Sequence, residues 1–190
     1  MKKLVVLLAA AMTASGCGAP AAIPATAPAA TIAAAASSST CARSTVVLVR
    51  HGEKASNDPD TELSAAGLER AKRIATMLGT AGVTRLVATD VRRTQQTLAP
   101  LSEKIGKPVE VRPARDVDGL LRELRASPPG AVVVVAHHSN GIPRIARAFG
   151  VEPRGILHSD TLPENDFSRV LVLSLDCDHE RAAGIELSSD

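Results

Sequence analysis

The chain has 190 residues, a formal net charge of +2 and 22% charged residues, so it is neither strongly acidic nor strongly basic. It contains no Trp or Tyr and only two Phe residues. No nucleic-acid partner is expected, because the chain has neither a basic run nor the aromatic side chains of a base-stacking surface. A core built from aliphatic side chains is expected instead.

The first 17 residues have the organisation of a lipoprotein-type export signal. Lys2 and Lys3 precede an apolar stretch, residues 4–12, that is too short to span a bilayer as a helix. Residues 14–17 resemble a bacterial lipoprotein processing site and predict lipidation at Cys17. This predicts an exported protein of the cell envelope, attached to a membrane by its lipid anchor only, on the periplasmic or extracellular face. An ordinary cleaved secretory signal is the alternative.

Composition divides the rest of the chain into a linker and a domain. Residues 18–43 are almost entirely Ala, Pro, Ser, Thr and Gly, which offer little apolar surface to bury, so they are predicted to be a tether. Residues 44–190 are predicted to form one domain of ordinary size. If Cys17 is lipidated, Cys41 and Cys177 remain. In an exported protein they would either form a disulfide bond or stay as two free thiols.

Strand and helix patterns alternate along the domain, beginning with a β-branched apolar run at residues 45–49 that predicts a buried central strand. Ser64 is expected to cap a helix that ends at Gly79. The apolar face of that helix is predicted to consist of Leu68, Ala71, Ile74, Ala75 and Leu78.

The later elements continue the alternation. Strands are predicted at residues 84–89, 108–111, 131–136 and 168–175, with residues 184–187 pairing back on the last of these. Helices are predicted from about Val91, with Pro100 kinking or breaking the helix, and at residues 118–126 and 142–149. The alternation predicts an α/β fold, a three-layer sandwich with a largely parallel central sheet.

Charged and nucleophilic side chains follow three of the predicted strands. Arg50 and His51 end the first strand, an arginine pair follows the second, and a histidine pair ends the fourth. The carboxyl ends of neighbouring parallel strands meet in one crevice, where open α/β sheets bind their ligands. A guanidinium group binds two phosphate oxygens at once, and a neutral imidazole can attack phosphorus. The pattern therefore predicts a site for phosphate chemistry.

Four motifs in this order resemble the histidine phosphatase superfamily, which has the phosphoglycerate mutase-like fold. The resemblance covers nearly all of residues 45–175 and indicates a short, exported bacterial member. The motifs are Arg-His-Gly-Glu-Lys at 50–54, Leu-Ser-Ala-Ala-Gly at 63–67 with Arg70-Ala71, Thr-Asp-Val-Arg-Arg-Thr-Gln-Gln-Thr at 89–97, and Val-Ala-His-His-Ser-Asn-Gly-Ile-Pro at 135–143.

The resemblance implies a role for each matching residue. His51 would be the nucleophile that forms a phosphohistidine, with its tautomer fixed by a hydrogen bond to the other ring nitrogen. Arg50, Arg93 and His138 would bind the phosphoryl oxygens. Asn57 matches a phosphate-contacting asparagine found in part of the superfamily. No metal and no other cofactor is implied.

Two assignments stay open at this point. Either His137 or His138 could be the phosphate ligand, and the alignment of Ser139, Asn140 and Pro143 with the superfamily favours His138. Many members carry a glutamate after the third strand that protonates the leaving group, and this chain has no clear match.

Asp116 and Glu53 are the candidates for that general acid, whereas Asp118 is better explained as a helix N-cap. Arg92, His158 and His179 are expected on the surface.

The sequence therefore predicts a metal-independent phosphomonoesterase that acts through a phosphohistidine at His51. Its partner would be a phosphorylated small molecule or a phosphoprotein. The first alternative is a non-catalytic envelope domain of the same fold that binds an anion or a partner. The second is a phosphoglycerate mutase, which the short domain and the missing acid disfavour.

Overall fold

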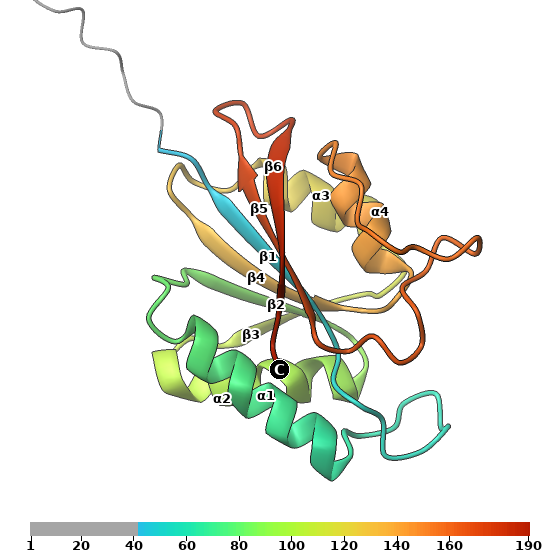
Figure 1. Ribbon diagram of the computed structural model, residues 1–190. Helices are drawn as coiled ribbons and strands as arrows, with labels where there is room; N and C mark the ends of the chain where they lie inside the picture. Colours follow the sequence, from blue (N-terminus) through green and yellow to red (C-terminus); the bar gives the residue numbers. More distant parts are fainter. Residues whose placement is uncertain (1–41) are drawn as a thin grey trace, which may run out of the picture. The chain divides into compact units, whose positions relative to one another are not determined.

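The computed structural model describes residues 42–190, in which one sheet of six strands lies between two pairs of helices (Figure 1). The elements are β1 (Thr45–Arg50), α1 (Ala65–Leu78), β2 (Arg85–Thr89), α2 (Arg92–Ile105), β3 (Val109–Arg112), α3 (Val117–Arg125), β4 (Val132–His137), α4 (Gly141–Ala148), β5 (Arg169–Leu175) and β6 (Ala182–Ser188).

The strand order is β3-β2-β4-β1-β5-β6. The first four strands of this order are parallel, β5 runs antiparallel to β1, and β6 runs antiparallel to β5. The predicted three-layer α/β fold with a largely parallel sheet is therefore confirmed. The order places the ends of β2, β4 and β1 side by side, as the convergence of the three motifs requires.

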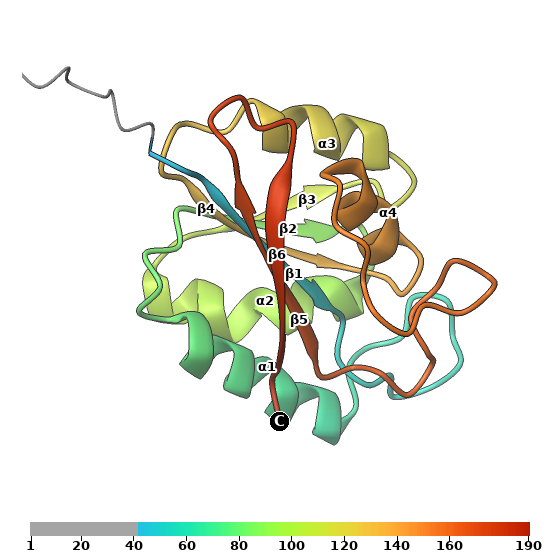
Figure 2. The same cartoon turned by 45° about the horizontal axis from the view of Figure 1, so that its top comes forward.

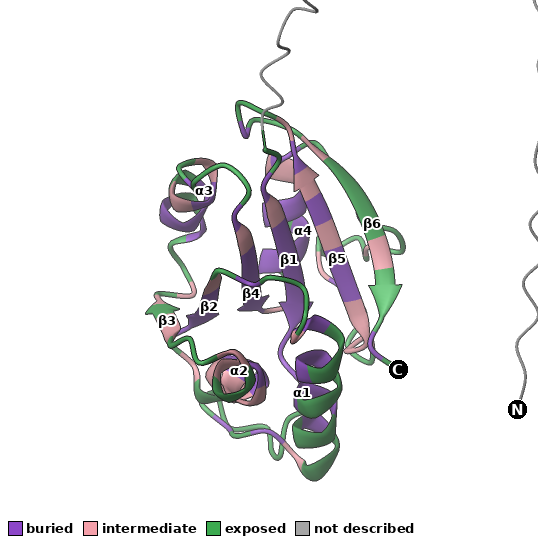
Figure 3. Cartoon of the chain, turned by 90° about the vertical axis from the view of Figure 1, so that its left-hand side faces the viewer, coloured by how far each residue is buried: buried purple, intermediate pink, exposed green. Residues whose placement is uncertain are grey.

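Alternate residues of the central strands pack against opposite helix layers (Figure 3). On β1, Val46 and Leu48 contribute to the core beneath α3 and α4, whereas Val47 and Val49 contribute to the core beneath α1 and α2. This is why the strand reads as a continuous apolar run, since side chains on both of its faces are buried.

The start of α1 is fixed against the end of β1 by two glycines. Ser64 caps the helix as predicted, accepting a hydrogen bond from the backbone N–H of Gly67 at 3.2 Å. A Cβ on Gly67 would lie 2.4 Å from the carbonyl oxygen of Glu53, and a Cβ on Gly52 would lie 2.9 Å from Gly67. Glycine is therefore required at both positions, because the two backbones approach too closely for a side chain.

The structure corrects three details of the predicted helices. Leu68 is 44% exposed, so it does not belong to the buried face of α1. The helix α2 continues through Pro100 to Ile105, so a break at the proline is wrong. The N-cap of α3 is Asp116 rather than Asp118, because the Asp116 carboxylate accepts a hydrogen bond from the N–H of Gly119 at 2.8 Å. Buried side chains beyond Pro100, such as Leu101, hold α2 together despite the missing backbone donor.

His179 is buried, and this overturns the prediction that it lies on the surface. Its Nδ1 is 2.9 Å from the carbonyl oxygen of Arg125, at the end of α3. Arg92 and His158 are exposed as predicted.

Two predictions for the N-terminal region, a disulfide bond of Cys41 and lipidation of Cys17, involve residues outside the described part of the chain. Cys177 is disulfide-bonded, but Cys41 lies outside residues 42–190, so the pairing of these two cysteines stays a prediction. Cys17 and the signal segment are outside as well. Within residues 42–190, every helix is too short or too polar to cross a membrane.

Candidate active site

A cavity of about 570 Å³ lies at the carboxyl ends of β1, β2 and β4, where the loops after β1 and α4 reach over the same end of the sheet (Figure 2). Arg50 pairs in register with His137 on β4, and the next backbone N–H, that of His51, donates to the His137 carbonyl at 3.0 Å. The lining residues are Arg50, His51, Lys54, Val91, Arg93, Ala114, His138, Ser139, Asn140, Thr161 and Glu164.

His51 has the geometry and the charge state of a nucleophile. Its side chain is only 4% exposed, and its Nδ1 lies 2.8 Å from the carbonyl oxygen of Gly52. Since a carbonyl accepts, Nδ1 carries the proton and Nε2 keeps a free lone pair. Burial lowers the pKa of His51 to about 4, with smaller contributions from the charges of Arg93 and Arg50. The imidazole is therefore neutral at pH 7.

Arg50 is buried beside His51 and joins the cavity to the loop before β5. Its Nη1 donates to three backbone carbonyls of that loop, Pro163 at 2.7 Å, Glu164 at 3.1 Å and Asp166 at 3.2 Å. Its guanidinium carbon lies 4.2 Å from the centroid of the Phe167 ring, within the range of a cation–π contact. These contacts use one end of the guanidinium group and fix its plane.

Arg93 approaches from the first turn of α2, on the other side of the cavity. Its Nη1 donates to the carbonyl of Pro59 at 2.7 Å, and its Nη2 lies 3.4 Å from Nδ1 of His138. An arginine only donates, so Nδ1 of His138 accepts and Nε2 donates to Thr89 Oγ1 at 3.0 Å. The rings of His51 and His138 are 5.4 Å apart between centroids. The structure thus brings His51, Arg50, Arg93 and His138 into one site.

Both arginines keep a buried donor without a partner. The Nε atoms of Arg50 and Arg93 are shielded from solvent and have no hydrogen-bond acceptor within residues 42–190. An unsatisfied buried N–H costs about 1–3 kcal/mol, and such groups are rare in folded proteins. Both guanidinium groups therefore keep hydrogen-bonding capacity that the described residues do not use.

Three of the predicted site residues are not brought to this cavity. Asn57 is exposed in the loop after β1 and does not line the cavity. Glu53 forms an ion pair with Arg70 at 2.6 Å, and this contact lowers the pKa of the Glu53 carboxyl. A carboxylate that is stabilised in its charged form is a poor proton donor. Asp116 caps α3, so neither candidate acid is placed to protonate a leaving group.

Among residues 42–190, Glu164 is the only carboxylic acid that lines the cavity, and it was not predicted from the sequence. Its side chain is exposed, and its backbone carbonyl is one of the three that Arg50 contacts. The loop that carries Glu164 has no periodic pattern and no motif. No signal in the sequence placed it near His51, because contacts more than a hundred residues apart bring it there.

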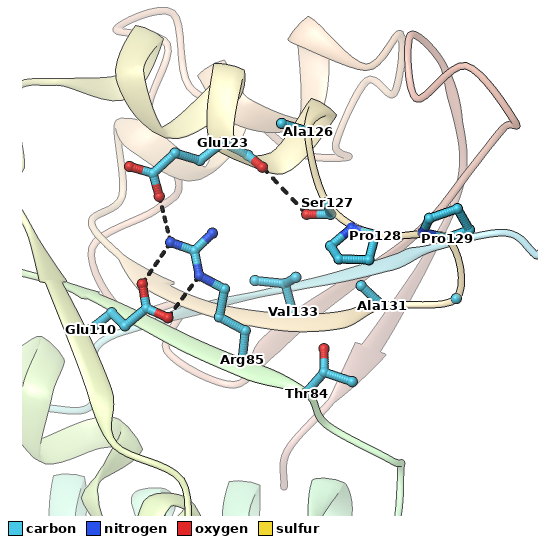
Figure 4. A pocket seen from close by; sticks show the side chains of 11 residues that line it. Thr84, Arg85, Glu110, Glu123, Ala126, Ser127, Pro128, Pro129, Ala131 and Val133 are labelled. Carbon is cyan, nitrogen blue, oxygen red and sulfur yellow. Dashed lines mark hydrogen bonds and ion pairs between the residues drawn. The ribbon is translucent and has the colours of Figure 1, made fainter.

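The opposite end of the strands also has a hollow, of about 490 Å³ (Figure 4). There Arg85 bonds to Glu110 and Glu123, which connects β2 and β3 to α3. The charges of this hollow are paired with one another, and no histidine or cysteine lines it. It therefore offers no nucleophile for phosphate chemistry. No group of three His, Cys, Asp or Glu side chains within residues 42–190 is arranged to hold a metal ion.

Part of the chain matches the family that its sequence motifs resemble. Residues 46–116 match the family model of the histidine phosphatase superfamily (branch 1). This match supports a relationship between the chain and the histidine phosphatase superfamily. A probable phosphoglycerate mutase, GpmB, from Enterobacter sp. (strain 638) is 37% identical over 68 residues, which cover 32% of this chain and 32% of that relative. The match to this curated relative thus spans about a third of its length.

Solved structures of phosphatases share the fold. The protein histidine phosphatase SixA, complexed with tungstate, has a TM-score of 0.62 and 21% identity, covering 76% of this chain and 97% of that chain. A mycobacterial glucosyl-3-phosphoglycerate phosphatase in complex with inorganic phosphate has a TM-score of 0.59 and 20% identity, covering 76% and 98%. The predicted phosphoglycerate mutase-like fold is confirmed.

The two adjacent histidines differ in position, and this difference leads to a prediction. His138 lines the cavity, whereas His137 is 3% exposed and its Nδ1 accepts from the backbone N–H of His138 at 2.9 Å. We expect His138→Ala to lower kcat for an aryl phosphate by about 100-fold or more, because the His138 ring lies beside His51 and its Nδ1 holds the Arg93 guanidinium, so its loss displaces a group that stabilises charge. His137→Ala should cost clearly less in kcat. Equal losses in the two folded variants would contradict the assignment of His138.

Burial of the site histidines predicts a pH dependence of stability. The pKa values of His51 and His137 are lowered to about 4 and that of His138 to about 3, in each case mainly by burial. Below the unfolded pKa of about 6.5, the unfolded chain binds protons that the native state excludes. The free energy of unfolding should therefore fall as the pH falls from 6.5 towards 4, by up to about 1.4 kcal/mol per pH unit for each histidine.

Urea denaturation at pH 7 and pH 5, in buffer without phosphate, measures this effect. The midpoint should be clearly lower at pH 5. Histidine side-chain NMR provides the direct check, because His51 should remain neutral at pH 5. A native pKa near 6.5 for His51, or equal midpoints at the two pH values, would contradict the predicted linkage.

Proposed function

We propose that this protein is a metal-independent phosphomonoesterase that acts through a phosphohistidine at His51. One observation carries the proposal: a buried, neutral His51 with a free Nε2 lies between two arginines whose buried Nε donors lack acceptors. The support for the superfamily and the fold shared with solved phosphatases agree with it.

The proposed reaction has two steps at one site. In the first, Nε2 of His51 attacks phosphorus, the bond from phosphorus to the ester oxygen breaks, and the leaving group departs with the bonding electrons. In the second, water attacks the phosphohistidine, the P–N bond breaks, and inorganic phosphate leaves with His51 restored. Phosphoryl transfer depends chiefly on positioning and charge stabilisation. Arg50 and Arg93 provide both, because their guanidinium groups are held by backbone carbonyls on either side of the cavity.

Within residues 42–190 no buried acid lines the cavity, and this bears on the substrate. Glu164 lies at the exposed rim, so protonation of a poor leaving group has no enclosed donor. We therefore propose substrates with good leaving groups, which are aryl phosphates among the phosphomonoesters and, as a second class, the phosphoramidate of phosphohistidine in a protein. The similar fold of SixA, a protein histidine phosphatase, is compatible with the second class.

Phosphate release from p-nitrophenyl phosphate by the 190-residue chain, in the presence of a chelator, tests the proposal. Steady turnover is expected. A folded protein that binds phosphate but releases none would favour the non-catalytic anion-binding alternative. A phosphoglycerate mutase would interconvert phosphoglycerates when primed with bisphosphoglycerate, whereas a phosphatase would only release inorganic phosphate.

We also propose that the protein is exported and anchored to an envelope membrane through lipidation of Cys17. The support is the signal-like composition of residues 1–17 and the tether-like composition of residues 18–43. Phase partitioning of the chain expressed in bacteria tests this. The parent should enter the detergent phase and Cys17→Ser the aqueous phase, and identical partitioning of the two would refute the anchor.

A further inference from the structure

A second hollow, of about 320 Å³, adjoins the cavity that contains His51. The two share Ala114, His138 and Asn140, so a molecule with its phosphoryl group at His51 can extend directly into this hollow. The proposed phosphoryl transfer makes no use of the residues on its far side.

Two arginines give the hollow a positive character. Arg115, in the loop before α3, is exposed and makes no ion pair or side-chain hydrogen bond within residues 42–190. Arg144, on the second turn of α4, lines the same hollow and pairs at 2.7 Å with Asp118, whose side chain is 68% exposed. Asp118 is outside the hollow, and no acidic side chain of residues 42–190 lines it. Arg115 therefore brings a positive charge to the hollow without an ion-pair partner among residues 42–190, and Arg144 brings a second one that the exposed Asp118 carboxylate partly offsets.

A hydrogen-bond donor at the end of β4 also lines this hollow. His137 lines the hollow although its side chain is only 3% exposed. Its Nδ1 accepts from the backbone N–H of His138, so the proton of the neutral ring is on Nε2. This N–H makes no hydrogen bond within the described residues and is available to a ligand in the hollow. A donor of this kind, beside two arginines, matches an oxygen anion.

We propose that this hollow is a second anion subsite, in which Arg115, Arg144 and His137 bind a carboxylate or phosphate carried by the substrate. The inference rests on the proposed function and makes it more specific. The substrate is a phosphomonoester with a second anionic group, which lies in the hollow while the phosphoryl group lies against His51. Charge-assisted hydrogen bonds to this group would stabilise the bound substrate.

A pair of aryl phosphates of the same shape tests the subsite. One carries a carboxylate on the ring and the other a carboxamide, each as the meta and the para isomer. We expect kcat/KM to favour the carboxylate by about tenfold or more for the better isomer, which corresponds to about 1.4 kcal/mol. In the Arg115→Gln/Arg144→Gln double variant this ratio should fall to about one.

Arg122→Gln is the matched control, since Arg122 is an exposed arginine of α3 that lines neither space. It should keep the ratio of the parent. A parent that hydrolyses both compounds equally, or a double variant that keeps the preference, would overturn the subsite. If the parent hydrolyses neither compound, the proposed phosphatase activity itself fails. Replacing the carboxylate with a phosphonate shows which anion is preferred.

Discussion

Replacing His51 with alanine is expected to abolish phosphate release from p-nitrophenyl phosphate. The variant loses the only neutral imidazole whose Nε2 is free at the cavity, because both ring nitrogens of His138 are already engaged. Removal of a catalytic nucleophile lowers kcat by roughly 10⁴-fold or more in well-studied hydrolases. Steady-state hydrolysis in the presence of a chelator measures the loss.

His158→Ala is the control for the loss of a histidine, because His158 is exposed and lines no part of the site. It should keep the activity of the parent. Activity that resists the chelator and survives in His51→Ala would mean that another group attacks phosphorus, and the proposed mechanism would then be wrong.

Replacing Arg93 with alanine is expected to lower kcat/KM by about 10³-fold. Arg93 provides charge on the side of the cavity opposite Arg50, and its buried Nε has no other acceptor among the described residues. Arginines that stabilise the transition state of phosphoryl transfer contribute roughly 10³–10⁵ in rate. Arg93→Lys should recover only part of the loss, because an ammonium group is a point charge and cannot bind two oxygens in a fork.

The neighbouring arginine provides a matched control within the same helical turn. Arg92 is exposed and pairs with Asp60 and Glu62. Arg92→Ala removes the same charge one residue away and should change kcat/KM by less than about threefold, because exposed ion pairs contribute little. If the two alanine variants lost similar activity, the loss would reflect the overall positive potential rather than a contact from Arg93.

The parts of the fold that were predicted correctly depend on local patterns. The run at residues 45–49 is apolar on both faces, and the structure buries it between two helix layers. Ser64 caps α1 because its side chain reaches the N–H of Gly67 three residues away. Residues at the carboxyl ends of such strands lie together at one edge of the parallel sheet. This is why Arg50, His51 and His138 were predicted to converge.

Features set by distant contacts were not predictable in this way. His179 was predicted on the surface, but it is buried, and its Nδ1 contacts the carbonyl oxygen of Arg125. Glu164 reaches the cavity because Arg50 binds the carbonyls of its loop, and no periodicity in that loop reports this contact. Asp116 and Asp118 are both spaced to cap a helix, and only the position at which α3 starts decided between them.

Trapping the covalent intermediate shows whether His51 carries the phosphoryl group during turnover. The protein is mixed with excess p-nitrophenyl phosphate, quenched within the first turnovers under alkaline conditions, digested, and analysed by mass spectrometry. We expect one phosphoryl group on the peptide that contains His51, attached to the imidazole and absent from His51→Ala. A protein that turns over substrate and carries the phosphoryl group on another residue, or never carries one, would contradict it.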